Sequence, residues 1–221
     1  MKTLKGTVGA LAGVAAVTLS AGASFVDLLV VDITDNTLGL SEYAVYAVFD
    51  GASDEVLTVF DANITTTTGF YHNSIGGGQQ SALPYTNAMT LASDNPDADS
   101  FVTIGHSTGD GNETTLLPTF DVSAFLGGNS IGVNAGWFNI EPLNDQGVPD
   151  SRGRVLIAVL TPLNDRTGRA GIVRGTLTVG YDDGQFPPSF ATASFITPAP
   201  GALGLLALAG LVGRSRRRHV E

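Results

Sequence analysis

Short segments rich in Val, Ile, Thr and aromatic residues constrain the fold of this 221-residue chain more than any other feature. Gly, Asp, Asn and Pro separate them, as expected for strands joined by turns, and we find no helix-period pattern between the two ends of the chain. About eight strands at this spacing predict an all-β domain, a two-sheet β-sandwich or jelly roll. The segments are 25–34, 42–50, 55–61, 100–105, 131–139, 153–161, 172–181 and 190–197.

Two links between these segments predict hairpins. Residues 50–54 and residues 162–168 are short and rich in turn-forming residues, so we expect each link to join two neighbouring strands of one sheet. Residues 44–49 (Ala-Val-Tyr-Ala-Val-Phe) are apolar on both faces of a strand, which predicts a central strand covered on each side.

The N-terminal residues 1–23 have the pattern of a secretory signal peptide. Lys2 and Lys5 precede an apolar stretch at residues 7–19, and the small residues Ala21 and Ala23 occupy the cleavage-determining positions. We therefore expect export through the Sec translocon and cleavage by signal peptidase after Ala23, which leaves a single domain over residues 24–197.

The C-terminal residues 198–221 form a second targeting pattern. A Pro motif is followed by 13 residues without a charge, 201–213, and then by a basic cluster. As a helix these 13 residues reach about 20 Å, a marginal membrane span, and the basic cluster would hold its end on the cytoplasmic face. The motif residues are Pro198, Ala199, Pro200 and Gly201, and the basic residues are Arg214, Arg216, Arg217 and Arg218.

The order of Pro motif, short apolar run and Arg cluster resembles the PEP-CTERM sorting signal of bacterial exosortase substrates. The resemblance implies a protein that is anchored transiently in the inner membrane and is then sorted by an exosortase-like enzyme to the cell surface or the extracellular space. The Pro-Ala-Pro-Gly form resembles secreted planctomycete members, as do several patches of the domain. These patches imply an uncharacterised extracellular β domain and no site residues; they are 45–50, 70–73, 100–105, 134–139 and 153–156.

The predicted domain is strongly acidic. Residues 24–197 contain five arginines, no lysine and 20 acidic residues, a net charge of about −15. Such a surface repels nucleic acid and anionic membranes, so no nucleic-acid partner is expected. The absence of cysteine excludes disulfides, a lipoprotein lipid anchor, a thiolate metal site and a cysteine nucleophile.

Calcium is the one cofactor for which the sequence offers candidate ligands. Asp94, Asp97 and Asp99 place carboxylates at close spacing in a loop, as hard cations prefer. The loop does not match an EF-hand, and solvated acidic turns are the alternative. Trp137, the only tryptophan, is expected in the core, with an exposed sugar-stacking platform as the alternative.

One motif resembles a catalytic one. Residues 105–109 fit the Gly-x-Ser-x-Gly elbow around Ser107, but a polar turn follows instead of a helix, and the only downstream histidine is His219 beyond the apolar run. A β-turn is therefore expected there, and His72 is expected to be structural or exposed. We predict a secreted, exosortase-sorted, non-catalytic β protein of the cell surface or extracellular matrix. An extracellular glycan-binding module, with or without calcium, and a secreted hydrolase are the alternatives.

Overall fold

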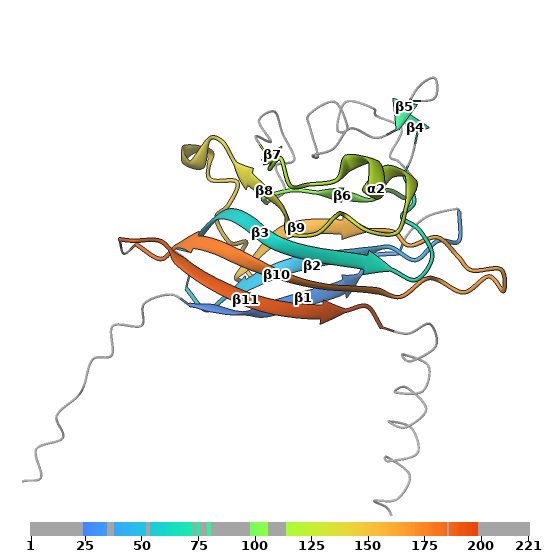
Figure 1. The fold of residues 1–221 in the computed structure, drawn as a ribbon. Coiled ribbons are helices and arrows are strands. Elements are labelled where there is room, and N and C mark those ends of the chain that lie inside the picture. The colour runs from blue at the N-terminus through green and yellow to red at the C-terminus, as the bar shows by residue number, and fades with distance from the viewer. Residues whose placement is uncertain are drawn as a thin grey trace, which may run out of the picture.

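The computed structural model describes residues 24–34, 38–51, 54–72, 74–75, 79–80, 98–105, 114–184 and 186–198. Two antiparallel sheets pack face to face, one with the strand order β1-β2-β9-β6 and the other β11-β10-β3-β8-β7 (Figure 1). The prediction of an all-β, two-sheet fold is confirmed. We call them the four-stranded and the five-stranded sheet; β4 and β5 form a separate two-stranded ladder.

The strands and helices have the following bounds. They are β1 (Phe25–Asp32), β2 (Tyr43–Phe49), β3 (Glu55–Thr66), β4 (Ser74–Ile75), β5 (Gln79–Gln80), β6 (Phe101–Val102), β7 (Thr114–Leu116), α2 (Val122–Gly127), β8 (Ala135–Asn139), the 3-10 helix η1 (Pro142–Asn144), β9 (Arg154–Leu160), β10 (Val173–Asp182) and β11 (Ser189–Ile196).

Both predicted hairpins are wrong, because each link crosses from one sheet to the other. The link after Phe49 leads from β2 in the four-stranded sheet to β3 in the five-stranded sheet, and the link after Leu160 leads from β9 to β10 in the same way. The physical reason is burial. Val45 on β2 and Val59 on β3 are both fully buried in the layer between the sheets, so the chain changes sheets to place them there.

A short helix, α2, was not expected from the sequence. Asp121 caps it, since its Oδ1 accepts a hydrogen bond from the backbone N of Ala124 at 2.8 Å. The helix buries Phe125, whose ring packs edge to face against Phe70 and Phe120. Six residues are too few for a helical period to emerge from a sequence, which explains why the helix was missed.

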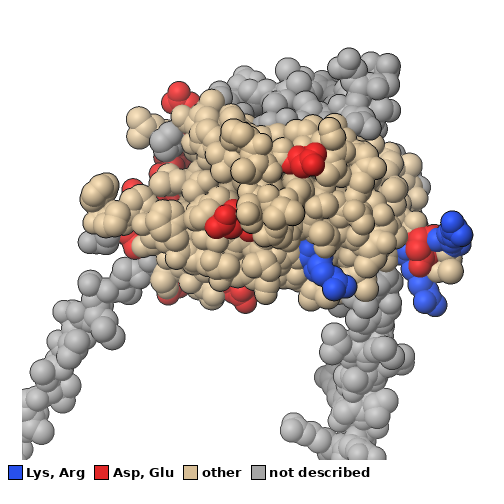
Figure 2. All heavy atoms as spheres, viewed as in Figure 1, with Lys and Arg blue, Asp and Glu red and all other residues tan. Residues whose placement is uncertain are grey.

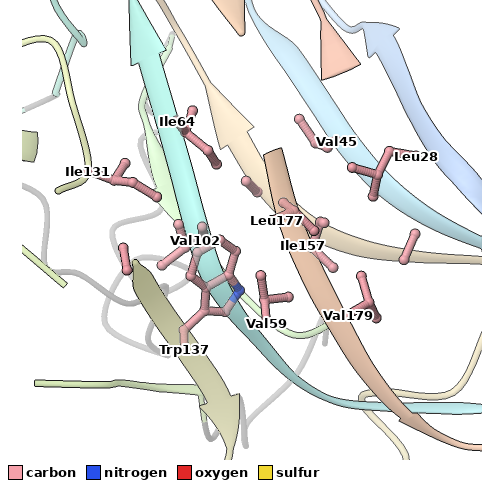
Figure 3. Packing of buried hydrophobic residues seen from close by; sticks show 14 of the residues in the cluster. Leu28, Val45, Val59, Ile64, Val102, Ile131, Trp137, Ile157, Leu177 and Val179 are labelled. Carbon is pink, nitrogen blue, oxygen red and sulfur yellow. The ribbon is translucent and has the colours of Figure 1, made fainter. Parts of the chain in front are cut away.

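The core lies between the sheets and includes Trp137 (Figure 3). Trp137 is fully buried, as expected, and its Nε1–H donates to the carbonyl oxygen of Thr103 at 2.9 Å. β2 pairs with β1 and β9, so its predicted central position in the sheet is confirmed; on its outer side Ala44 is buried in a second small cluster, whereas Tyr46 and Val48 are half-buried. That second cluster consists of Ala44, Phe101, Leu156 and Val159, with Tyr46 packed against it.

We expect Leu177→Ala to lower the free energy of unfolding by about 2–5 kcal/mol, because the side chain is fully buried between the sheets and its removal leaves a cavity. Leu143 is 92% exposed, so Leu143→Ala should change the free energy by about 0.5 kcal/mol or less. Urea unfolding of both variants measures the difference. Equal losses in the two variants would contradict the position of Leu177 in the core.

Candidate functional site

The outer face of the five-stranded sheet carries hydroxyl groups and aromatic rings. Residues alternate along its strands, so one set faces the core and the other faces outward. We define the outer face by the outward residues of three cross-strand rows of β3, β10 and β11, which are Thr58, Phe60, Asn63, Thr176, Thr178, Phe190, Thr192 and Ser194; the adjoining row holds Thr65, Arg174 and Ile196.

Cross-strand pairing places these side chains in rows. Thr178 lies opposite Thr192 on β11 and opposite Phe60 on β3, and the two threonine Oγ1 atoms are 2.8 Å apart. In the next row the ring of Phe190 packs edge to face on Phe60, with ring centres 5.7 Å apart. The result is an aromatic pair beside threonine hydroxyls, of which the side chain of Thr178 is buried and those of Thr176 and Thr192 are exposed.

Because Gly180 has no side chain, the ring of Phe190 can lie close to the backbone of β10. A Cβ at Gly180 would lie 3.1 Å from an atom of that ring and 2.7 Å from Cγ2 of Thr58. The ring therefore lies close over the glycine backbone, yet Phe190 remains 63% exposed. An aromatic ring fixed in position and open to solvent can stack on an apolar face of a ligand.

This side of the molecule bears few charges. β3, β10 and β11 run across the side that faces the viewer in Figure 1, and Figure 2 shows that side as largely uncharged. More of the acidic residues lie toward the left edge of this view. A binding surface here would suit an uncharged, hydroxyl-bearing ligand better than an ionic one.

A buried polar cluster lies elsewhere, where residues 70–72 meet residues 98–100. Nδ1 of His72 is 3.7 Å from Oδ1 of Asp99, and both side chains are 2% exposed. Nε2 of His72 donates to the carbonyl oxygen of Phe125 at 3.0 Å, because that oxygen can only accept. His72 is thus a structural residue that ties the chain to α2.

Glu42 belongs to the same cluster. Burial raises the pKa of the Glu42 carboxyl to about 7, and the nearby charge of Asp99 adds to this rise, while a hydrogen bond from the backbone N of Asp99 opposes it. A carboxyl with a pKa of about 7 is about half protonated at neutral pH and could serve as an acid, but this one lies among buried groups. We assign a structural role to this cluster.

The candidate metal ligands are only partly described. Asp99 accepts a hydrogen bond from the backbone N of Ser100 at 2.7 Å and is buried, whereas Asp94 and Asp97 lie outside the described residues. Within the described ranges, no group of three or more His, Cys, Asp or Glu side chains could hold a metal ion. Calcium binding by this loop stays a prediction.

The targeting and elbow residues lie mostly beyond the part of the chain that is described. Pro198 is its last residue, and it follows Thr197, which is held to β10 by two hydrogen bonds with Val173. Over the described ranges, no helix is long and apolar enough to cross a membrane. The residues outside are Ala21, Ala23, Ser107, Ala199, Pro200, Gly201, Arg214, Arg216, Arg217 and Arg218.

Sequence reasoning missed two features. One is the outer face, whose signal was the alternation of Thr and Ser with Ala in residues 190–195. The other is an acidic end of the sandwich, where Asp54 is fully buried and neither carboxylate oxygen has a hydrogen-bond partner. Burial raises the pKa of Asp54 to about 6, and the charges of Asp50 and Asp183 add to the rise.

An open hollow of about 300 Å³ lies beside the end of α2. Its lining carries no ionisable side chain, and the hydroxyl of Thr68 is already bonded to the carbonyl oxygen of Leu163 at 2.8 Å. The hollow offers neither an acid, a base nor an activated nucleophile. The lining residues are Thr68, Gly69, Phe70, Leu126, Gly127, Gly128, Asn129 and Leu163.

Comparison with protein-family models, with curated proteins and with solved structures finds no match for the chain.

We expect Glu42→Gln to stabilise the protein at pH 8 by about 1–2 kcal/mol. The gain is of this size because solvent screens part of the charge of the half-buried Glu42 carboxylate. Because the folded-state pKa of Glu42, about 7, lies above the ordinary value of 4.5, the stability it contributes is full at low pH and is lost as the pH rises through 7. The amide keeps an acceptor for the backbone N of Asp99 and carries no charge, so the gain should vanish near pH 4.

Urea unfolding at pH 4, 6 and 8 measures the effect. Glu141→Gln removes the same charge from an exposed side chain and is the matched control. An equal gain in both variants at pH 8 would show that general charge repulsion, rather than burial of Glu42, is responsible.

Proposed function

We propose that the protein is a secreted, exosortase-sorted, non-catalytic β-sandwich of the bacterial cell surface or extracellular matrix. The observation that carries this proposal is the position of the sandwich in the chain: its strands fill the stretch between the two predicted targeting patterns. β1 starts at Phe25, two residues after the expected cleavage position at Ala23, and β11 stops at Ile196, two residues before the Pro motif at Pro198.

The geometry of the last strand supports removal of the tail. β11 is an edge strand, and Thr197 closes it by donating its backbone N–H to Val173 O at 2.9 Å and accepting the Val173 N–H on Oγ1 at 3.0 Å. Cleavage after these bonds would leave every described strand intact. The proposed partners are the Sec translocon, signal peptidase and an exosortase-like enzyme, and the proposed route is through a transient inner-membrane anchor to the surface.

Changing Arg214, Arg216, Arg217 and Arg218 together to Ser should spoil retention and orientation of the tail. A 13-residue apolar run has little hydrophobic energy to spare, so it depends on its positive flank. Membrane fractionation of the exported protein measures the effect.

The matched control changes four exposed arginines of the domain, Arg152, Arg166, Arg169 and Arg174, to Ser, which alters the net charge equally. Normal processing and location of the tail variant would contradict the proposed sorting signal.

A second candidate function, glycan binding, is favoured by the outer face. Sugar rings present C–H faces that pack on aromatic rings and hydroxyls that exchange hydrogen bonds with threonine, which matches Phe60, Phe190 and the threonine rows. A domain near −15 repels acidic polysaccharides, so a neutral extracellular polysaccharide is the proposed ligand. The face does not require calcium for this binding.

We expect the protein to co-sediment with amorphous cellulose, used as a neutral glycan probe, and Phe190→Ser to weaken this binding about 5- to 10-fold by removing the stacking ring. Phe186→Ser is the matched control, because Phe186 is 96% exposed but lies between β10 and β11, off the outer face. Binding that is absent, or reduced equally by both substitutions, would contradict the glycan candidate.

A further inference from the structure

Ser24, the residue before β1, is held by Asp50. Its backbone N donates to Oδ1 of Asp50 at 2.7 Å, its hydroxyl donates to Oδ2 at 3.2 Å, and its carbonyl oxygen accepts from the backbone N of Asp50 at 3.2 Å. Phe25 pairs with Phe49 at the start of the β1–β2 ladder. This register places their neighbours, Ser24 and Asp50, opposite each other.

The surroundings of this contact are acidic. The charges of Asp50 and Asp183 both act on the buried carboxyl of Asp54, whose oxygens accept no hydrogen bond. Asp27 on β1 adds a further carboxylate nearby in the chain, and the hydroxyl of Tyr181 accepts a long hydrogen bond from Phe25 N at 3.5 Å.

No cationic side chain among the described residues lies within ion-pair distance of Asp50. The two ion pairs of these residues join His72 to Asp99 and Arg154 to Asp150. Arg154 already pairs with Asp150: its Nε and Nη2 donate to Oδ2 of Asp150 at 3.3 Å and 2.8 Å.

We propose that Asp50 is a binding site for the α-ammonium group that cleavage after Ala23 creates on Ser24. Hydrolysis adds the hydroxyl of water to the carbonyl carbon of Ala23 and a proton to the nitrogen of Ser24, and the new amine takes up one more proton at neutral pH. The nitrogen that donates to Asp50 as a neutral amide then donates as a cation, which gives a stronger, charge-assisted hydrogen bond.

This ion pair would give the acidic end a positive charge that no side chain of the described residues supplies by an ion pair with Asp50. It would also hold Ser24 at the entrance to β1, an edge strand of the four-stranded sheet. Signal-peptide removal would therefore stabilise the mature fold after export. The inference depends on the predicted cleavage site and not on a matrix or glycan-binding role.

The sequence permits a direct test, because Lys2 and Lys5 are its only lysines and both leave with the signal peptide. In the exported, processed protein the α-amine of Ser24 is then the single primary amine. Reductive dimethylation with ¹³C-formaldehyde labels this amine alone, and one NMR signal reports its pKa. We expect a pKa about half a unit to one unit higher in the native protein than in the same sample in urea.

Asp50→Asn should abolish this difference, whereas Asp61→Asn should leave it unchanged. Asp61 is exposed on β3 and has a φ of 48°, a conformation that asparagine tolerates, so it is a matched loss of one charge. Equal pKa values for native and unfolded parent protein, a native shift that survives Asp50→Asn, or a mature N-terminus other than Ser24 would each overturn the proposal. Should Asp50→Asn fail to fold, the comparison of native with unfolded parent protein decides the question.

Discussion

The inner faces of the two sheets bury each other, and the course of the chain depends on this contact. Val45 of the four-stranded sheet and Leu177 of the five-stranded sheet belong to one fully buried layer with Trp137. Because β2 and β3 each contribute to that layer from opposite sides, the link between them must turn at the end of the sandwich. The same crossing brings Asp50 and Asp54 to that end, where they join Asp183 in an acidic group.

The sequence predicted those features of the fold that repeat along the chain. The all-β class, the central position of β2 and the burial of Trp137 follow from local composition, so they could be recognised without a structure. Whether residues 50–54 form a hairpin or a crossing could not be recognised, because a turn-rich link is compatible with both, and the choice depends on which distant strands share a sheet.

The candidate sites were predicted less well, and for a related reason. The close spacing of acidic residues indicated a loop in which Asp99 faces a cation. In the structure the side chain of Asp99 lies beside His72, a residue 27 positions earlier in the chain. The outer face depends on register: Thr178 meets Thr192 and Phe60 only because β10 pairs with both β11 and β3. Contacts between segments that are far apart in sequence leave no local signal.

The half-buried Glu42 and the fully buried Asp54 illustrate how differently the fold treats acids. Glu42 accepts a hydrogen bond from the backbone N of Asp99 and belongs to a network with His72, so its burial connects segments of the fold. Asp54 is buried without such bonds, and its acidic neighbours oppose its ionisation. Both groups are driven toward the protonated form, but only the first gains hydrogen bonds in return.

The proposed processing would change the charge of the chain in one direction. Removal of residues 1–23 would take away both lysines, and removal of the tail would take away four of the nine arginines, so the proposed mature domain would retain five lysine or arginine side chains against 20 acidic ones. Salt screens the repulsion between distant carboxylates but acts weakly on buried groups such as Asp54. A cation fixed beside Asp50 would act at that short range, which is why the new amino terminus at Ser24, rather than bulk salt, suits the acidic end of this sandwich.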